Sequence, residues 1–312
     1  MSKRVLLTGG TGFVGANLAR RLLREGHALH LLVRPAHDPW RIAEIRGDIR
    51  LHLLDLADAP AVAHAVAQIR PDWIFHLAAH GAYSWQVDTA QIFQTNLLGT
   101  IHLVDACLRT GFESFIHTGS SSEYGWKDHA PAETEWLEPN SAYAVAKASA
   151  TLYGRSVAQA RKVNLTTLRL YSAFGPYEDP NRLMPSLIRH GLRGEWPPLV
   201  HPATARDYVY VDDVCDACLL VAQSVPRDWG AVYNVGTGVQ TSLRDVVALV
   251  RRVLEIQAEP PWGTLPARTW DTSTWQADPR KLQTELGWQP RHTLEEGFRQ
   301  MLAQRSHREL VV

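Results

Sequence analysis

The sequence predicts an α/β fold, with a doubly wound parallel sheet and a smaller α/β lobe toward the C-terminus. Short apolar runs alternate with longer segments of helical periodicity through the first half of the chain, which is typical of repeated βαβ units. A glycine-rich turn connects the first apolar run to the first helical segment. From about residue 172 the elements become shorter and prolines and tryptophans become frequent, which indicates a second lobe.

The length and net charge of the chain limit the kinds of partner that it is expected to bind. With 312 residues and 45% hydrophobic composition, the chain is long enough for a large domain with a smaller appendage. Lysine plus arginine equals aspartate plus glutamate at 32 each, so no overall field attracts nucleic acid or an anionic membrane. No apolar stretch reaches membrane-spanning length, and the first residues lack the apolar core of a secretory signal. We therefore expect a cytoplasmic protein that holds any anionic ligand with local charge.

The three cysteines are Cys107, Cys215 and Cys218, a small and odd number that fits a reducing compartment better than a disulfide framework. Cys215 and Cys218 have the spacing of some redox and metal motifs. They lie inside an apolar helical run, however, without a second pair of ligands nearby in the sequence. We interpret them as packing residues and expect no metal site.

The first strand is expected at residues 5–7, and the sequence Thr-Gly-Gly-Thr-Gly-Phe-Val-Gly follows it directly. Within this motif Gly9, Gly12 and Gly15 recur at every third position, and a helical pattern of leucines continues the chain. Glycines in this arrangement permit a tight turn and let a pyrophosphate approach the backbone at the helix N-terminus. The motif therefore predicts a dinucleotide site in a Rossmann-type sheet.

The second strand, expected at Ala28–Val33, ends in Arg34, about twenty residues beyond the glycine motif. An acidic residue here would bind the ribose 2′-hydroxyl of NAD, whereas an arginine suits the 2′-phosphate of NADP. Arg34 therefore favours NADP(H). NAD(H) stays an alternative, with Arg34 solvated and Asp38 on the ribose. Arg41 is either a second phosphate ligand or a residue of an exposed helix face.

Further strands are expected at residues 50–54, 73–77 and 114–118, with helices at Ala59–Ile69 and 89–109 between them. In a parallel sheet of this kind, ligands bind beyond the carboxyl ends of the strands. The residues that follow each strand are therefore the first candidates for contacts with a cofactor or substrate.

Four such candidates follow the third and fourth strands. Asp55 is placed to contact the adenine, while Ala78 and Ala79 allow the cofactor to approach the backbone closely. His80 is a candidate substrate contact, although a loop histidine without a ligand is the more common case. Asn96 lies inside the next helix, where it needs a polar partner if it faces the sheet and none if it is exposed.

The strongest candidates for chemistry are a hydroxyl-rich loop and a helical pair. The fifth strand leads into Gly-Ser-Ser-Ser-Glu-Tyr-Gly at residues 119–125, where Ser120 is placed to hydrogen-bond a substrate oxygen. Tyr143 and Lys147 are four residues apart at the start of a helical run, so they share one face. A neighbouring ammonium lowers the pKa of a phenol from its usual value of about 10, which suits acid/base catalysis.

In this order, these motifs resemble the extended short-chain dehydrogenase/reductases, the NAD(P)-dependent family of nucleotide-sugar epimerases, dehydratases and reductases. The resemblance extends over almost the whole chain. It rests on residues 8–15, Asp55 and Leu56, 75–79, Asn96, 120–125, Tyr143 and Lys147, Gly175 and Pro176, 206–214, 233–236 and 286–290.

The resemblance implies a role for each matching residue. Tyr143 would be the catalytic acid/base, Lys147 would hold the nicotinamide ribose and lower the tyrosine pKa, and Ser120 would polarise the substrate oxygen, with Ser121 as the fallback. The implied cofactor-binding residues are Gly9, Gly12, Phe13, Val14, Gly15, Arg34, Asp55, Leu56, Leu77, Ala78, Ala79, Asn96, Tyr143 and Lys147.

The C-terminal part is expected to hold the substrate. We assign residues 1–171 to a dinucleotide-binding domain and 172–312 mainly to a substrate lobe, interleaved with the last elements of the first domain. Arg206 and Arg268 are the candidate phosphate ligands, because a neutral chain needs local guanidinium groups to bind a nucleoside diphosphate. Surface ion pairs are the alternative for both. Ser172 replaces an asparagine that often contacts the substrate in this family.

The departures from the family pattern favour one reaction. Dehydratases of the family carry an Asp-Glu pair after the catalytic hydroxyl residue, whereas Ser121 and Ser122 stand there and Glu123 falls one residue late. Together with Arg34, this loop looks most like the reductases of 4-keto-6-deoxy sugars linked to GDP or CDP. We expect an NADP(H)-dependent reductase of this kind. A 4-epimerase with bound NAD is the alternative, and a scaffold without chemistry is a third reading that the presence of Tyr143 and Lys147 disfavours.

The resemblance also implies a homodimer. In this family the helices that hold Asn96 and Tyr143 pack against those of a second copy as a four-helix bundle. The expected small-molecule partner is a nucleoside-diphosphate sugar.

Overall fold

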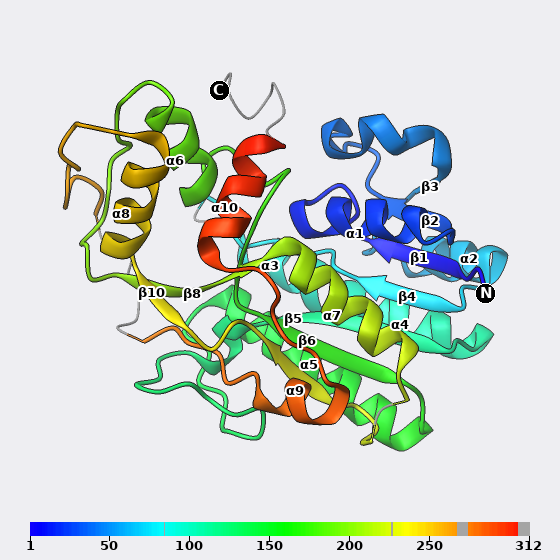
Figure 1. Ribbon diagram of the computed structural model, residues 1–312. Helices are drawn as coiled ribbons and strands as arrows, with labels where there is room; N and C mark the ends of the chain where they lie inside the picture. Colours follow the sequence, from blue (N-terminus) through cyan, green and yellow to red (C-terminus); the bar gives the residue numbers. More distant parts are fainter. Residues whose placement is uncertain (84, 226, 267–273, 305–312) are drawn as a thin grey trace.

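A computed structural model of the chain describes residues 1–83, 85–225, 227–266 and 274–304 (Figure 1). Its main element is a seven-stranded sheet in which every recorded pairing is parallel. The strand order is β3-β2-β1-β4-β5-β6-β9. The strands are β1 (Arg4–Thr8), β2 (Ala28–Val33), β3 (Ile49–Leu53), β4 (Trp73–His76), β5 (Ser114–Ser120), β6 (Leu165–Leu170) and β9 (Val232–Val235).

Helices cover both faces of this sheet, as its apolar strands require. Helices α1 (Phe13–Arg24) and α7 (Val211–Gln223) contribute to the core on one face. Helices α2 (Ala59–Ile69), α4 (Gly99–Thr110) and α5 (Ala142–Arg161) contribute to the core on the other. Parallel strands buried on both sides read as continuous apolar runs, which is why the sequence shows them as such. The predicted doubly wound α/β fold is therefore confirmed.

The bounds of several predicted elements differ from the structure by a residue or two, and two differences concern the site. The helix expected at residues 89–109 is three segments: α3 (Thr89–Phe93), a π-helical turn at η2 (Gln94–Leu98) and α4. The π turn contains Asn96, whose side chain is held by the backbone of His80, and π turns are frequent at functional sites. Strand β5 continues to Ser120, beyond the expected residue 118, because its ladder with β6 continues to that residue.

The second lobe has its own small sheet and core. Strands β7 (Ser172–Phe174), β8 (Ala205–Tyr210) and β10 (Gln240–Ser242) pair in the order β10-β8-β7. A separate apolar cluster joins this sheet to the helices above it in Figure 1. Those helices are α6 (Leu183–Gly191), α8 (Leu243–Leu254) and α10 (Leu294–Ala303). The remaining elements are η1 (Trp40–Asp48), η3 (Ser121–Tyr124) and α9 (Arg280–Leu286).

The cysteines are buried thiols. Cys215 and Cys218 lie within α7, and burial raises the pKa of both thiols, which disfavours the reactive thiolate. Within the described ranges, no group of three or more histidine, cysteine or acidic side chains is arranged to hold a metal ion. In the same ranges, no helix has the length and apolar character needed to cross a membrane.

Candidate active site

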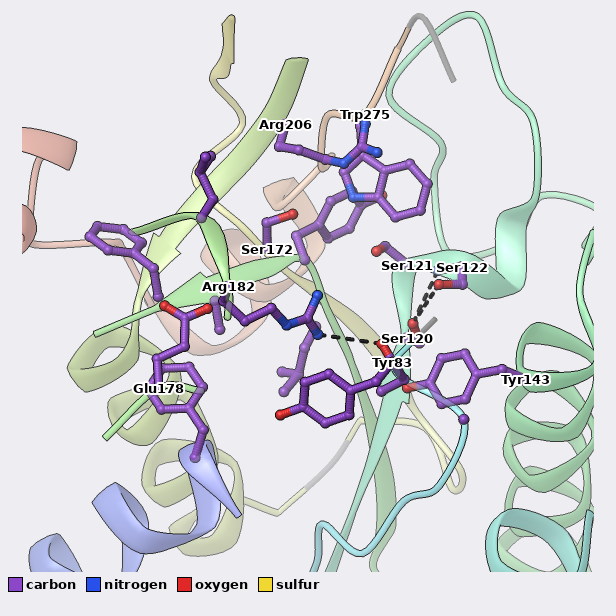
Figure 2. Close-up of a pocket in the computed structure, with 18 of the residues that line it drawn as sticks. Tyr83, Ser120, Ser121, Ser122, Tyr143, Ser172, Glu178, Arg182, Arg206 and Trp275 are labelled. Atoms are coloured by element: carbon purple, nitrogen blue, oxygen red, sulfur yellow. Dashed lines mark hydrogen bonds between the residues drawn. The ribbon is translucent and has the colours of Figure 1, made fainter. Parts of the chain in front are cut away.

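A cavity of about 770 Å³ opens where the carboxyl ends of the main strands face the second lobe. Both lobes line it: β5 and α5 contribute from the main sheet, and residues after β6, together with α6 and β8, contribute from the second lobe. Ligands of open parallel sheets bind at this position. Figure 2 shows the polar side chains that converge there.

The glycine turn between β1 and α1 forms one wall of this region. Gly9 has a φ of +71°, and a Cβ at this position would lie 2.5 Å from the carbonyl carbon of Leu77. At Gly15 a Cβ would lie 2.2 Å from the carbonyl oxygen of Gly9. Only glycine fits either position, so the backbone of the turn stays open to a ligand. Phe13 and Val14 from the start of α1 line the cavity, as do Leu77 and Ala79 after β4.

Ser120, Tyr143 and Lys147 come together at the floor of the cavity, and all three line it. Ser120 caps the short helix η3: its hydroxyl accepts from the Ser122 amide at 3.2 Å and donates to the Ser122 hydroxyl at 3.0 Å (Figure 2). Tyr143 and Lys147 project from the first turns of α5, which begins after the N-cap Ser141. The Lys147 ammonium donates to the carbonyl oxygen of Thr118. The arrangement offers a hydroxyl, a phenol and an ammonium to one ligand.

The electrostatics of this trio differ from the expectation in one respect. Burial lowers the pKa of Lys147 to about 8. Burial raises the pKa of Tyr143, and the nearby Ser120 hydroxyl acts in the opposite direction. The lowered tyrosine pKa expected from Lys147 is therefore absent, because the ammonium is directed at a backbone carbonyl and desolvation of the phenol dominates.

Glu123 is not available as an acid or base in the cavity. It is fully buried, and its Oε1 accepts from the Ser120 amide at 2.8 Å and from the Thr151 hydroxyl at 3.1 Å. Its Oε2 forms a 2.8 Å ion pair with Arg169 of β6. Arg169 in turn donates to the hydroxyl of Tyr124 at 2.8 Å. Both oxygens of the Glu123 carboxylate are therefore hydrogen-bonded, and the bond to the Ser120 amide holds the hydroxyl-rich loop of residues 119–125 in place.

Asn96 and His80 form a pair. The Asn96 amide donates to the carbonyl oxygen of His80 at 2.7 Å, and its oxygen accepts from the His80 amide at 2.9 Å. Asn96 thus fixes the backbone that follows Ala79, with its own side chain buried. Burial lowers the pKa of His80, with a further contribution from the positive charge of Arg34. The cavity lining does not include His80.

Arg34 and Arg41 have different environments. Arg34 is exposed at the end of β2, and within the described residues its guanidinium makes no hydrogen bond or ion pair. The Arg41 guanidinium donates to the carbonyl oxygens of Tyr177 at 2.7 Å and Thr11 at 3.4 Å, and it stacks on Trp40 at 4.4 Å. Arg41 therefore ties the glycine turn to the second lobe, and Arg34 is the better placed of the two for a phosphate.

Asp55 and Leu56 follow β3. Asp55 accepts from the amide of Ala57 at 2.9 Å, so its carboxylate shapes the turn. Leu56 is buried and packs against Gly99 at the start of α4. A Cβ at Gly99 would lie 3.0 Å from the Leu56 side chain, so this part of the site is closely packed.

The three remaining described candidates, Ser121, Ser172 and Arg206, all line the cavity. The Arg206 guanidinium lies 4.8 Å from the ring centre of Trp275 and donates to the carbonyl oxygen of Ala205 at 2.8 Å. Figure 2 shows Ser121 and Ser172 on either side of the space below this stacked pair. Arg268, the second arginine expected here, lies outside the described residues.

The structure adds cavity residues that sequence reasoning missed. Tyr83, Glu178, Arg182 and Trp275 all line the cavity (Figure 2). Arg182 precedes α6 and extends toward Tyr83, which lies in the loop after β4. No short motif marks these positions, because they meet only through the packing of the two lobes. The sequence patterns predict no element at residues 182–191, so they hold no signal for Arg182.

The fold and the cavity define the class of protein. It is a Rossmann-type α/β protein with a glycine turn, a hydroxyl loop and a tyrosine–lysine pair around one ligand cavity. A family model described as the NAD dependent epimerase/dehydratase family matches residues 5–236. The chain belongs to this family of nucleotide-sugar enzymes, and the resemblance inferred from its motifs is confirmed.

Individual relatives agree with this assignment. A UDP-glucose 4-epimerase of Mycolicibacterium smegmatis is 30% identical over 305 residues, which covers 95% of this chain and 96% of the relative. A UDP-glucose 4-epimerase of Thermotoga maritima, solved with UDP-glucose, has a TM-score of 0.87 at 27% identity, covering 96% of this chain and 97% of its own. The enzyme of that name from Thermus thermophilus, solved with NAD, has a TM-score of 0.85 at 28% identity, covering 96% and 98%.

Burial of the charged Lys147 ammonium lowers the free energy of unfolding by a measurable amount. Its pKa is about 8, against an ordinary 10.5, and each pKa unit corresponds to about 1.4 kcal/mol. The native state therefore binds the proton less tightly than the unfolded chain, and the cost is complete at neutral pH. We expect Lys147→Met to increase the free energy of unfolding by about 1–3 kcal/mol at pH 7 while turnover is lost.

The pH dependence separates this cost from a general packing effect. The cost disappears as pH rises from about 8 to 10.5, so the stability difference between the two proteins should shrink over that interval. Lys281→Met is the matched control, because Lys281 is only half-buried and donates to the Val232 carbonyl. Denaturant unfolding of all three proteins at pH 7 and pH 10 checks the prediction. A K147M protein that is less stable than the wild type at pH 7 would contradict it.

Proposed function

We propose that the protein is an NADP(H)-dependent reductase of a nucleotide-linked 4-keto-6-deoxy sugar. The observation that carries the proposal is the hydroxyl-rich loop of residues 119–125. Its serine hydroxyls face the cavity, while the Glu123 carboxylate is paired with Arg169. A dehydratase needs an acid and a base in this loop to remove water from the sugar. A reductase needs only a hydroxyl and a proton donor, which Ser120 and Tyr143 supply.

The reaction divides between the cofactor and the residues of this chain. Bound NADPH would supply the hydride to the C4 carbonyl. Tyr143 donates its proton to the oxygen that becomes an alkoxide, and Ser120 stabilises the charge on that oxygen through its hydroxyl. The raised pKa of Tyr143 keeps the phenol protonated and ready to donate. The Lys147 ammonium lies one turn further along α5, where it is placed to hold the nicotinamide ribose.

Two guanidinium groups support a nucleoside diphosphate as the carrier of the sugar. Arg182 and Arg206 both line the cavity and reach it from the substrate lobe (Figure 2). Arginine binds phosphate oxygens through paired N–H donors, and each such bond is charge-assisted. We assign these two residues to the diphosphate, and the expected role of Arg268 stays a prediction.

The preference for NADPH rests on Arg34. We expect Arg34→Gln to weaken NADPH binding by about 10- to 100-fold, because one charge-assisted contact to the 2′-phosphate is lost. NADH, which lacks that phosphate, should bind within twofold of its wild-type affinity. Arg41→Gln is the contrast, because Arg41 supports the glycine turn and its loss should weaken both dinucleotides alike. Fluorescence titrations of both dinucleotides check this, and equal losses in the R34Q protein would contradict it.

A 4-epimerase of a nucleoside-diphosphate sugar is the second candidate. It is favoured by the relatives, among which UDP-glucose 4-epimerases have 27–30% identity over nearly the whole chain. An epimerase would use the same residues, with Tyr143 first accepting and then returning the proton of the C4 hydroxyl. The dinucleotide would then stay bound through the cycle, and Asp38 rather than Arg34 would contact its ribose.

One experiment separates the two candidates. The freshly purified protein is denatured and the released dinucleotide is identified by chromatography, followed by turnover assays with a panel of nucleotide sugars. An empty site that prefers NADPH and reduces a 4-keto-6-deoxy sugar nucleotide supports the reductase. Stoichiometric NAD together with interconversion of a C4 epimer pair establishes the epimerase and sets aside the role of Arg34.

The proposal includes a homodimer through α4 and α5. Leu98, directly before α4, and Val145 and Leu152 on α5 are exposed apolar side chains. Two copies that pack these helices together would cover them as a four-helix bundle. Light scattering of the purified protein gives the oligomeric state directly.

A further inference from the structure

Within the described residues, Arg182 has an unusual environment for a guanidinium inside a cavity. Its Nη2 donates to the carbonyl oxygen of Ala82 at 3.5 Å, which is a long hydrogen bond, and no carboxylate in the described part of the chain lies within ion-pairing distance. The side chain is half-buried and extends into the space between the lobes (Figure 2). Most of its five N–H donors are therefore available to a ligand.

An aromatic stack holds this guanidinium in place. Arg182 lies 4.9 Å from the ring centre of Tyr83, which is cation–π geometry. Tyr83 stacks in turn on Trp85, with ring centres 4.6 Å apart and an angle of 18° between the rings. The arginine belongs to the substrate lobe and both rings belong to the loop after β4. The stack thus bridges the two lobes across the cavity.

The backbone at Gly81 and Tyr83 is held next to Tyr143 by the side chain of Gln86. The Gln86 side-chain oxygen accepts from the amides of Gly81 at 2.8 Å and Tyr83 at 3.4 Å. Gly81 has a φ of +94°, and a Cβ there would lie 3.3 Å from the ring of Tyr143. Asp88 ends the loop by capping α3. The position of Tyr83 is therefore set by the same framework that holds Tyr143.

We propose that Tyr83 is a positioning residue that holds Arg182 at the substrate through the stack with Trp85. The inference rests on the proposed function, because it assigns the Arg182 guanidinium to an anionic or oxygen-rich group of a nucleotide sugar. Tyr83 makes no bond to that group. It keeps a long and flexible side chain in one place before the substrate arrives, which reduces the entropy lost on binding. The ring face is the part that acts, and the hydroxyl is dispensable.

A double-mutant cycle tests this mechanism. The variants are Tyr83→Phe, Tyr83→Ala, Arg182→Gln and the double variant Tyr83→Ala/Arg182→Gln. The probes are UDP-, dTDP-, GDP- and CDP-glucose, and the affinity of the one that binds tightest to the wild type is followed by calorimetry. NADPH affinity and thermal stability are measured in parallel, because a general disturbance of the loop would change both.

We expect Y83A to weaken binding of the sugar nucleotide by about 3- to 10-fold, the range that one cation–π contact supports. Y83F, which keeps the ring, should bind within twofold of the wild type. The double variant should bind as weakly as R182Q alone, because Tyr83 acts only through Arg182. Trp136→Ala is the matched control for loss of an exposed ring, since Trp136 is 82% exposed and does not line the cavity.

The possible failures are distinguishable. Equal affinity of Y83A and the wild type, or the same Y83A loss in the R182Q background, would overturn the positioning role and leave the proposed function intact. A loss in Y83A accompanied by an equal loss of NADPH affinity would overturn it also, by showing that the loop as a whole had moved. A wild-type protein that binds none of the four sugar nucleotides would overturn both proposals.

Discussion

Tyr143→Phe is expected to lower turnover by about 10²- to 10⁴-fold, the contribution of a positioned acid or base. Phenylalanine keeps the ring that packs against the loop at Gly81 and removes only the hydroxyl that lies beside Ser120. Dinucleotide affinity should therefore change less than twofold, since no cofactor contact of the ring is removed. Steady-state kinetics together with cofactor titrations separate the two effects.

Tyr153→Phe is the control for this substitution. Tyr153 lies on the same helix, α5, and its hydroxyl donates to Asp105 at 2.7 Å, away from the cavity. Its loss should leave turnover unchanged. Turnover of Y143F above one tenth of the wild-type value would rule out Tyr143 as the proton donor.

Glu123→Gln is expected to destabilise the fold by about 3–5 kcal/mol, the usual cost of leaving a buried charge without its partner. The Arg169 side chain is 3% exposed and that of Glu123 is fully buried, and the two form an ion pair at 2.8 Å. Glutamine keeps the size of the side chain but supplies no charge to the guanidinium. Turnover should fall as well, because the amide of Ser120 loses its carboxylate acceptor.

Denaturant unfolding measures this cost directly. Glu295→Gln is the control, since Glu295 pairs with Arg299 and Arg252 on the surface and should leave stability within experimental error. An E123Q protein as stable as the wild type would show that Arg169 does not depend on this carboxylate. In that case Glu123 could rotate into the cavity, and the argument against dehydration would fall with it.

The fold was largely predictable from local patterns. Strand β2 and helix α2 begin and end where the sequence places them, because buried parallel strands and amphipathic helices leave their own periodicity in the chain. The prediction was wrong at residues 89–109, where a π turn interrupts the helix. Nothing local distinguishes that turn, since it accompanies the contact between Asn96 and a distant backbone segment.

The candidate site was predictable in part. Ser120, Tyr143 and Lys147 each follow a recognisable local motif, and the structure brings all three to one cavity. Their catalytic roles remain predictions. The sequence indicated only that Glu123 falls one residue late for a dehydratase carboxylate. It did not predict that Glu123 holds the hydroxyl-rich loop, because its ion-pair partner Arg169 is 46 residues further along the chain.

What the sequence alone determined about this protein is the βαβ order, the glycine turn, the family and the residues that match its motifs. These depend on neighbours within a few positions along the chain, where spacing sets geometry. Only the tertiary structure decided which charges face the cavity. Arg182 meets Tyr83 across the two lobes, Arg41 is drawn to the glycine turn, and Glu123 is turned inward to Arg169. Such pairings depend on how separate elements pack. No local sequence pattern identifies the partner of a side chain when that partner lies on another element.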